Sequence, residues 1–267
     1  KEYRSLFLGM KKIQKNRDNP HLKKARLLSF PGGMEELAQK LAFPLKKEIL
    51  LAHRVKKIAR GKDYWAVTHK NHEGMVTEEK FDEVISTIPS HQILSIEWDS
   101  VEGMENISTL ASATHYPLAL VYLGFQKKDI KHPLDGFGFL VPEVENLKIL
   151  GTLFSSTLFP GRAPDGQVLL TTFVGGERNP ELAKLPDHAL GELVQNELSK
   201  LLGIQAPPVF IEVKKWPAAI PLPDAEMEKR KNAAKKLSSL NPGLCFSGSF
   251  LTGVSLPNCL EASTFEF

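Results

Sequence analysis

Two apolar runs flank a turn-rich segment in the stretch Ile149-Leu-Gly-Thr-Leu-Phe-Ser-Ser-Thr-Leu-Phe-Pro-Gly-Arg-Ala-Pro-Asp-Gly-Gln-Val-Leu-Leu-Thr-Thr-Phe-Val174. The runs Ile149–Phe154 and Val168–Val174 have the length and the apolar, partly β-branched composition of strands. Between them, Phe159–Gly166 contains a Pro-Gly and an Asp-Gly dipeptide, both typical of turns. The stretch therefore predicts two antiparallel strands joined by a tight hairpin connection.

Most other segments around this pair are also short apolar runs bounded by Gly or Pro. Antiparallel-looking strands dominate the middle and strand–helix units lie at both ends, so the sequence predicts an α+β fold. Asp187 is positioned as a helix N-cap and Gly203 as a helix end. The further strands predicted are Arg26–Phe30, Ile49–Lys56, Tyr64–His69, Glu83–Ile88, Leu118–Phe125, Phe137–Val141 and Val209–Lys215, and the helices are Met34–Leu41, Asp187–Leu202 and Asp224–Leu240.

The composition is that of a globular protein, with 42% hydrophobic and 24% charged residues among 267. The longest apolar run, Pro117–Phe125, has about half the length that a membrane-spanning helix needs. Cys245 and Cys259 are too few for a disulfide framework and lack the spacing of a zinc site. These features argue against a membrane-spanning protein and indicate a reducing compartment.

Charge is unevenly distributed along the chain. Residues 1–62 contain 17 Lys and Arg against 5 Asp and Glu, whereas the remaining residues contain 17 against 26. A basic start is typical of segments that bind nucleic acid or an anionic membrane surface. However, no aromatic residue interleaves with the lysines between Lys11 and Lys24, as single-strand binding would favour. We therefore interpret residues 1–25 as a solvated, partly flexible segment and expect no nucleic-acid partner.

Motifs for nucleophilic or metal chemistry are missing from the sequence. There is no Gly-x-Ser-x-Gly, and neither cysteine has a histidine partner nearby in the sequence. His69 and His72 lie three residues apart in a predicted hairpin, a spacing that favours metal ligation only weakly. We therefore predict no catalytic side chain and no metal site.

Glycine placement is more informative. Two glycines lie between a predicted strand and a predicted helix in Phe30-Pro-Gly-Gly-Met34, and Ser247-Gly-Ser-Phe-Leu-Thr-Gly253 precedes a predicted final helix that starts near Pro257. Glycines beside a helix N-terminus let a ligand approach the backbone closely. On spacing alone, an ordinary tight turn is the simpler interpretation of the first cluster.

Seven motifs, taken in order along the chain, resemble those of the oxygen-dependent, FAD-containing protoporphyrinogen oxidase family. The resemblance spans residues 26–262, and its Gly-Thr-Leu-Phe-Ser-Ser and Phe-Pro-x-Arg-Ala-Pro pair is highly specific. The Gly-Gly-Met turn and the terminal glycine loop are shared with the wider flavin amine oxidase superfamily. The motifs are Phe30-Pro-Gly-Gly-Met34, Val84-Ile-Ser-Thr-Ile-Pro-Ser90, Leu150-Gly-Thr-Leu-Phe-Ser-Ser156, Phe159-Pro-Gly-Arg-Ala-Pro164, Thr172-Phe-Val-Gly-Gly176, Trp216-Pro-Ala-Ala-Ile-Pro221 and Ser247-Gly-Ser-Phe-Leu-Thr-Gly-Val-Ser-Leu256.

This resemblance implies a substrate-binding mixed sheet domain with helices, together with the C-terminal part of an FAD-binding, Rossmann-like α/β domain. The Gly-x-Gly-x-x-Gly segment that holds the FAD pyrophosphate has no counterpart here, and Glu261-Ala-Ser263 stands where the family usually has Glu-Ser-Gly. We therefore expect the C-terminal portion of a longer enzyme, inactive alone. The predicted domains are a basic segment (1–25), part of the FAD-binding domain (26–90), the substrate-binding sheet domain (91–215) and a return to the FAD-binding domain (216–267).

Matching the motifs residue by residue implies two sets of contacts. Aliphatic walls and an aromatic face suit a flat, mostly apolar tetrapyrrole. From the sequence alone, a position in the core of its own strand is the better explanation for Val55, Leu140, Leu153 and Phe173, and it explains Trp216 equally well. In the family, the arginine for a substrate propionate lies in the absent segment. The implied contacts are Val55, Trp216, Val254, Ser255 and Leu256 for FAD, and Leu140, Leu153 and Phe173 for the substrate.

The function implied by the resemblance is oxidation of protoporphyrinogen IX to protoporphyrin IX in haem biosynthesis, with FAD as cofactor and O2 as acceptor. The chemistry belongs to the cofactor, which is consistent with the lack of an acid–base pair. Alternatives are a coproporphyrinogen III oxidase, another flavin amine-oxidase-like enzyme, and a non-catalytic porphyrin-binding module. We expect a cytoplasmic location with peripheral contact to the inner face of a membrane, and a homodimer is left open.

Overall fold

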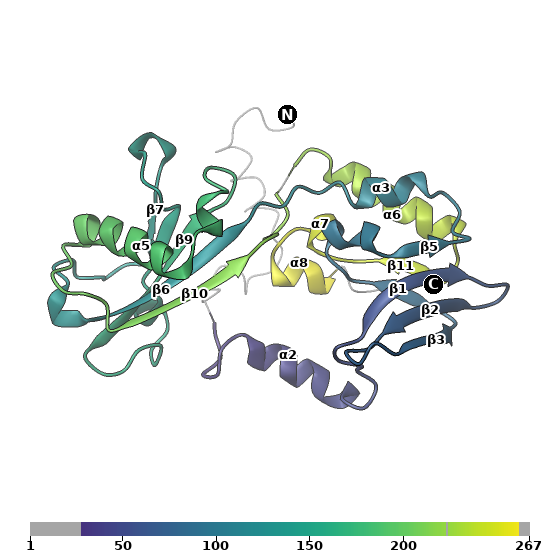
Figure 1. Ribbon diagram of the computed structural model, residues 1–267, viewed down its shortest axis with the longest axis horizontal. Helices are drawn as coiled ribbons and strands as arrows, with labels where there is room; N and C mark the ends of the chain where they lie inside the picture. Colours follow the sequence, from purple (N-terminus) through teal and green to yellow (C-terminus); the bar gives the residue numbers. More distant parts are fainter. Residues whose placement is uncertain (1–27, 223, 262–267) are drawn as a thin grey trace, which may run out of the picture. The chain divides into compact units, whose positions relative to one another are not determined.

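The computed structural model describes residues 28–222 and 224–261, and the chain divides into two compact units, residues 1–49 and 50–267 (Figure 1). The described part of the first unit contains α2 (Glu35–Ala42) and the 3-10 helix η2 (Phe43–Leu45). Residues 28–30 are not a strand, so the prediction of a strand at Arg26–Phe30 is wrong there, and residues 26 and 27 lie outside the described residues. Gly33, with φ 95°, instead donates its N–H to Phe30 O in a tight turn before α2.

A four-stranded sheet opens the second unit. β1 (Arg54–Arg60), β2 (Trp65–Lys70) and β3 (Val76–Phe81) form an antiparallel meander, and β5 (Glu97–Asp99) pairs with β1 in parallel. The sequence predicts β1 from Ile49 onward, but the strand begins only at Arg54. β3 and β5 escape prediction because their acidic and basic residues interrupt the apolar pattern on which strand prediction depends.

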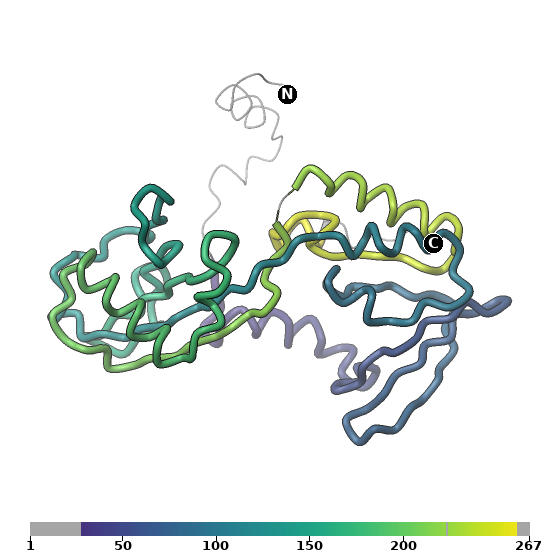
Figure 2. Tube along the Cα trace, turned by 45° about the horizontal axis from the view of Figure 1, so that its top comes forward, coloured from purple at the N-terminus to yellow at the C-terminus, as the bar shows by residue number. Residues whose placement is uncertain are grey.

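Two helices from distant parts of the sequence share a core with this sheet. α3 (Glu105–Leu110) and α6 (Met227–Leu240) lie side by side (Figure 2). Ile107 of α3 and Leu237 of α6 are buried in one hydrophobic cluster with Trp65 of β2. The sheet and the helix pair therefore form one folded body around this cluster.

A two-stranded parallel sheet joins the same core. β4 (Val84–Ser86) pairs with β11 (Leu244–Phe246), and the 3-10 helix η3 (Ser90–Ser95) follows β4. After β11 come two short helices, α7 (Ser249–Thr252) and α8 (Leu256–Glu261). The final helix is thus confirmed, beginning one residue before Pro257.

Five antiparallel strands form a second large sheet in the order β10-β6-β9-β8-β7. Thr152 pairs with Thr172, so the antiparallel pairing predicted for β8 and β9 is confirmed. Their connection is longer than a tight hairpin, because the short helix α4 (Ser155–Leu158) occupies its start. The strands are β6 (Leu118–Gln126), β7 (Gly138–Leu140), β8 (Gly151–Leu153), β9 (Gln167–Gly175) and β10 (Phe210–Trp216), with the 3-10 helices η4 (Lys127–Asp129), η5 (Glu143–Glu145) and η6 (Leu182–Lys184) in the connections.

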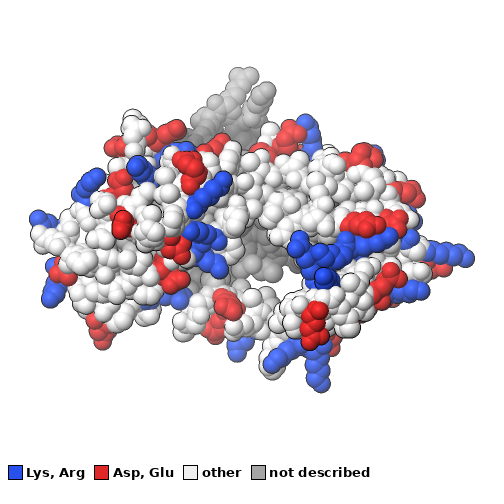
Figure 3. Space-filling view, in the orientation of Figure 1, with Lys and Arg blue, Asp and Glu red and all other residues white. Residues whose placement is uncertain are grey.

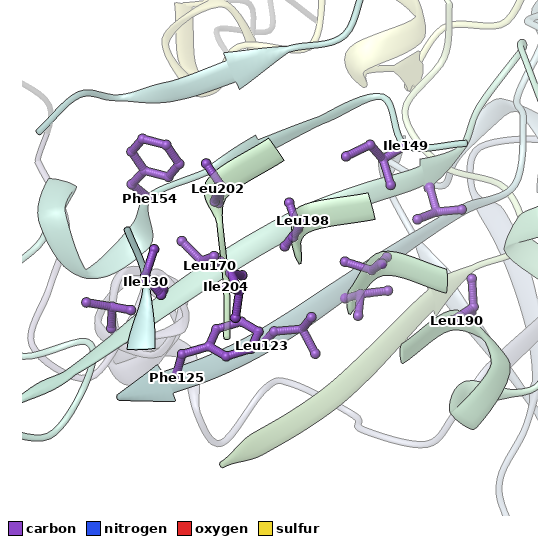
Figure 4. Packing of buried hydrophobic residues seen from close by; sticks show 14 of the residues in the cluster. Leu123, Phe125, Ile130, Ile149, Phe154, Leu170, Leu190, Leu198, Leu202 and Ile204 are labelled. Atoms are coloured by element: carbon purple, nitrogen blue, oxygen red, sulfur yellow. The ribbon is translucent and has the colours of Figure 1, made fainter. Parts of the chain in front are cut away.

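One face of this sheet is covered by the long helix α5 (Asp187–Leu202). Leu190 and Leu198 of α5 pack against alternate residues of the central strands, such as Leu123 and Leu170 (Figure 4). Successive residues of a strand point to opposite faces of the sheet. The residues that face α5 are therefore buried, and the residues between them lie on the opposite face of the sheet. The α+β fold class predicted from the sequence matches this arrangement.

The ends of α5 test two sequence predictions. Gly203, with φ 64°, ends the helix in the left-handed region as predicted. The predicted N-cap is wrong, because Pro186 occupies that position and Asp187 is the first helical residue. The Asp187 carboxylate instead lies 2.6 Å from Lys215 Nζ on β10, which ties the helix start to the edge of the sheet.

Charged side chains of both signs are interspersed over the face of the molecule drawn in Figure 3. Lys57 illustrates the pattern: its Nζ lies 2.7 Å from Asp99 Oδ2 and 3.1 Å from Glu97 Oε1. Within the two described ranges, no helix combines the length and the apolar character needed to cross a lipid bilayer.

Candidate functional site

Leu140, Leu153 and Phe173, the residues predicted to contact a substrate, share the face of the five-stranded sheet opposite α5. Side chains of directly paired residues in an antiparallel sheet point to the same face. Phe173 pairs with Gly151, Gly151 pairs with Leu140, and Leu153 follows Gly151 by two positions. We call this surface the open face. Its strand residues are Leu118, Leu120, Tyr122, Gly124 and Gln126 of β6, Gly138 and Leu140 of β7, Gly151 and Leu153 of β8, Gln167, Leu169, Thr171, Phe173 and Gly175 of β9, and Phe210, Glu212, Lys214 and Trp216 of β10.

The open face is mostly apolar and more exposed than the face under α5. Leu140 is 87% exposed, and Leu153 and Phe173 are half-buried. The β9 residues that belong to the core cluster, Val168, Leu170 and Val174, have the opposite parity. An aromatic ring flanked by aliphatic side chains on an accessible surface can hold a flat apolar ligand.

Gly151 lies between Phe173 and Leu140 in the row of paired residues that crosses the open face. A Cβ atom at this position would lie 2.6 Å from the Phe139 carbonyl oxygen, closer than van der Waals contact allows. Glycine therefore permits the close approach of β7 and β8. A Cβ atom here would also lie 3.1 Å from Leu140 Cδ2, so the Leu140 side chain packs close to the Gly151 backbone.

Trp216, one of the five predicted cofactor contacts, lies at one end of the open face. It is the last residue of β10 and pairs with Leu118, which has the parity of Leu120 and Phe173. The indole is 47% exposed, and Lys214 Nζ lies 5.5 Å from the centre of its ring. The structure thus places this predicted cofactor residue on the same surface as the three predicted substrate residues.

The parallel β4–β11 pair has a carboxyl edge at which the chain makes a glycine turn. Ligands of parallel α/β sheets bind outside the carboxyl ends of the strands. At this edge Ser247 N donates to Ser86 O at 3.0 Å, and the chain then turns through Gly248, with φ 150°, into α7. A Cβ atom on Gly248 would lie 2.8 Å from the Phe250 ring, so the turn requires glycine and presents bare backbone. Such an edge fits the cofactor implied by the sequence motifs.

Of the other predicted cofactor residues, Val55 lies in the four-stranded sheet, and the remaining three follow α7. Val55 on β1 packs against the same hydrophobic cluster as Phe250. Val254, Ser255 and Leu256 follow α7 and are exposed. The structure therefore brings Val55 and α7 to one cluster, whereas Trp216 belongs to the open face, and their contact with a cofactor stays a prediction.

Arg230 of α6 holds α7 in place through a hydrogen bond to Phe250. No role is predicted for this residue from the sequence. Its side chain is 1% exposed and donates from Nη1 and Nη2 to the two carboxylate oxygens of Asp224, at 3.0 and 2.7 Å. Its Nε donates to the Phe250 carbonyl at 3.2 Å. Asp224 also accepts from Glu226 N, so it lies just before α6 instead of inside the predicted helix. The pair positions the loop at the candidate cofactor edge.

Stability should depend on pH through Asp224. Hydrogen bonds from Arg230 hold the pKa of this carboxyl below its usual value. A group with a lowered folded-state pKa stabilises the fold above its unfolded pKa of about 3.9, and the contribution is lost as the pH falls through the folded value. We therefore expect the stability difference between wild type and Asp224→Asn to shrink on acidification below about pH 4. Urea unfolding at a series of pH values measures this, and a constant difference would contradict it.

His115 joins three segments and was also missed. Its Nδ1 donates to the Ala219 carbonyl, which can only accept, so Nε2 accepts from Ser90 Oγ at 2.7 Å. Ala219 N donates back to Tyr116 O at 3.0 Å. The His91 ring packs edge-on at 4.7 Å, and burial lowers the pKa of His91. Histidine spacing gives no signal for such a contact, because the partners are distant in sequence.

Comparison with known sequences gives the chain its family. The family described as flavin containing amine oxidoreductase matches residues 2–264. Mitochondrial protoporphyrinogen oxidase of Nicotiana tabacum is 35% identical over 245 residues, covering 88% of this chain and 49% of that protein. Coproporphyrinogen III oxidase of Bacillus subtilis (strain 168) is 24% identical over 268 residues, covering 97% and 55%. The chain spans about half the length of these curated relatives.

Solved structures share the fold. A protein from Exiguobacterium sp. 255-15, whose name also refers to protoporphyrinogen oxidase, superposes with a TM-score of 0.76 at 24% identity, covering 97% of this chain and 54% of that one. Reduced UDP-galactopyranose mutase gives 0.63 at 16% identity, covering 93% and 52%. The predictions of the fold class and of a flavin as the family's cofactor are confirmed. The chain belongs to the flavin-containing amine oxidoreductase family.

Proposed function

We propose that this chain is part of an FAD-dependent enzyme that oxidises protoporphyrinogen IX to protoporphyrin IX with O2 as the acceptor. The observation that carries the proposal is the grouping of Leu140, Leu153 and Phe173 on one accessible apolar face, with Trp216 at its end. The name of the 35% identical tobacco relative supports the choice of substrate. The chain supplies this face and one edge of the cofactor site.

The open face holds the macrocycle flat and keeps water away from it. Phe173 provides the aromatic surface, and Leu153 of β8 and Leu140 of β7 provide aliphatic walls on the neighbouring strands. When bound, FAD supplies the capacity to accept a hydride. The protein contributes orientation and exclusion of solvent, which are the effects that positioning residues exert on such reactions.

Side-chain acid–base chemistry is not needed in this proposal. Tyr122 lies on the open face in the row of Thr171 and Leu153. Burial raises the pKa of its phenol, so Tyr122 stays protonated and neutral at physiological pH.

The backbone turn at Gly248 and the exposed Val254, Ser255 and Leu256 are the residues that would hold FAD at the carboxyl edge.

The proposal is tested by porphyrin fluorescence. The longer, FAD-loaded enzyme of which this chain is part should convert protoporphyrinogen IX to a fluorescent porphyrin in air, faster than coproporphyrinogen III, and anaerobic conditions should stop turnover. Phe173→Ala should raise the KM at least about tenfold because the aromatic surface is lost. Protein without FAD corrects for spontaneous oxidation. Bound flavin with no conversion of either substrate would overturn the proposal, and faster conversion of coproporphyrinogen III would support the alternative that the Bacillus subtilis relative suggests.

A further inference from the structure

Lys214 places a positive charge at the edge of the mostly apolar open face. Among the strand residues that make up this face, only Lys214 and Glu212, both on β10, carry a charge. Lys214 Nζ lies 5.5 Å from the centre of the Trp216 ring, so the lysine side chain extends along the face toward Trp216. Sites for organic ligands combine such apolar and aromatic surfaces with one or a few polar groups that fix orientation.

The pairing register places Lys214 in the same row of the sheet as two predicted substrate residues. Lys214 pairs with Leu120, and Leu120 pairs with Phe173. The row continues through Gly151 to Leu140. Two strand spacings, about 10 Å, separate the backbones of Lys214 and Phe173. A flat ligand of tetrapyrrole size that lies on Phe173 therefore brings the side chains on its rim to the lysine.

The charges around Lys214 leave its ammonium group available to an anion. Within the described parts of the chain, no carboxylate forms an ion pair with Lys214, whereas the next residue, Lys215, pairs with Asp187 of α5. Glu212 lies two positions away on the same face, roughly 7 Å along the strand. Both side chains are exposed, so solvent and salt screen the repulsion between Glu212 and an anion bound at Lys214.

We infer that Lys214 binds a carboxylate of the substrate and thereby sets the orientation of the macrocycle on the open face. The inference rests on the proposed function, because a tetrapyrrole that packs on Phe173 directs acidic side chains on its rim toward β10. The acid groups of protoporphyrinogen IX lie on one side of the ring, so a cation at one edge of the face favours one orientation. The ammonium group donates charge-assisted hydrogen bonds to the carboxylate.

Binding of product porphyrin to the longer, FAD-loaded enzyme tests this inference. Protoporphyrin IX and its dimethyl ester share the macrocycle, but only the free acid carries carboxylates. Lys214→Gln should raise the Kd of the free acid about fivefold, as expected for the loss of an exposed ion pair, and leave the Kd of the ester unchanged. Lys214→Arg should retain most of the affinity, because the charge is kept. Added salt should weaken wild-type binding of the acid more than binding of the ester.

Three further variants control for charge and for packing. Lys128→Gln removes an exposed positive charge of η4 outside the open face and should leave both Kd values unchanged. Glu212→Gln removes the negative charge beside Lys214 and should lower the Kd of the acid by no more than about twofold. Phe173→Ala should weaken acid and ester equally, because it removes aromatic surface and no charge. Thermal unfolding of each variant shows that folded proteins are being compared.

The outcomes separate this inference from the proposed function. An unchanged Kd for the free acid in Lys214→Gln, or an equal loss for acid and ester, would overturn the role of Lys214 while leaving porphyrin binding intact. Loss of bound FAD from Lys214→Gln, followed by the flavin absorbance, would also overturn it, because the lysine would then serve the cofactor. Failure of the wild type to bind either form would overturn the proposed function itself.

Discussion

Replacing Asp224 by alanine is expected to lower the free energy of unfolding by about 3–5 kcal/mol, because a buried guanidinium loses its counter-ion. Arg230 is 1% exposed, and two of its three described hydrogen bonds end on Asp224. The third, to the Phe250 carbonyl, satisfies a donor but does not neutralise the charge. Urea unfolding followed by circular dichroism measures the loss.

A double variant separates the lost ion pair from other effects. Asp224→Ala combined with Arg230→Met should recover much of the stability, since an apolar side chain of similar length fills the site without a charge. Glu226→Ala is the matched control. Among the residues that the structure describes, its carboxylate pairs with Lys229 alone, which is 70% exposed, so the loss of stability should stay below about 1 kcal/mol. Equal losses in Asp224→Ala and Glu226→Ala would contradict the assignment of Arg230 as a buried anchor.

Gly138→Ala is expected to cost about 2–4 kcal/mol, from backbone strain and overpacking together. Gly138 has φ 134°, and a Cβ atom there would lie 2.1 Å from Thr152 O and 2.9 Å from Leu153 Cα. β7 can relieve this clash only by moving away from β8. Because β7 carries Leu140, the variant should also weaken porphyrin binding.

Gly136→Ala gives the matched control on the same segment. Nothing lies within 4 Å of a Cβ atom at Gly136, so the substitution should change stability by less than about 0.5 kcal/mol. Thermal unfolding measures the stability of both variants, and porphyrin titration measures their binding affinity. If Gly138→Ala were as stable as Gly136→Ala, the close approach of β7 and β8 would not be a constraint on the fold.

The strands and helices that the sequence predicts correctly are those with a strong apolar pattern. The strands predicted at Leu118–Phe125 and Val168–Val174 are one or two residues shorter than β6 and β9, and the helix predicted at Asp187–Leu202 matches α5 at both ends. β3 and β5 carry several charged residues on exposed positions, so the period-2 signal that identifies strands is weak in them.

The candidate site shows a different limit. The motif resemblance selects Leu140, Leu153 and Phe173, but each of them looks like a core residue from its neighbours alone. Phe139 and Leu140 are adjacent and both apolar, yet Phe139 packs against the core while Leu140 is 87% exposed. Pairing register decides between the two faces, and register is a property of the assembled sheet.

Arg230 marks a second limit of sequence reasoning. It is one of several cations in Met227–Leu240, and nothing in the spacing distinguishes it from Lys229 or Lys231, whose carboxylate partners lie on the exposed surface. Its burial depends on the approach of α7 from later in the chain. Such a residue is found only once the tertiary contacts are known.

The parallel pairing of β4 with β11 sets the order in which parts of the chain can be completed during synthesis. Val84 pairs with Leu244, so the whole five-stranded sheet lies within the loop that this pairing closes. All strands of that sheet leave the ribosome before Leu244 does, and a sheet already folded reduces the chain entropy lost when so long a loop closes. The open face is therefore finished first, and the carboxyl edge of β4 and β11 is completed late in the maturation of the newly made chain.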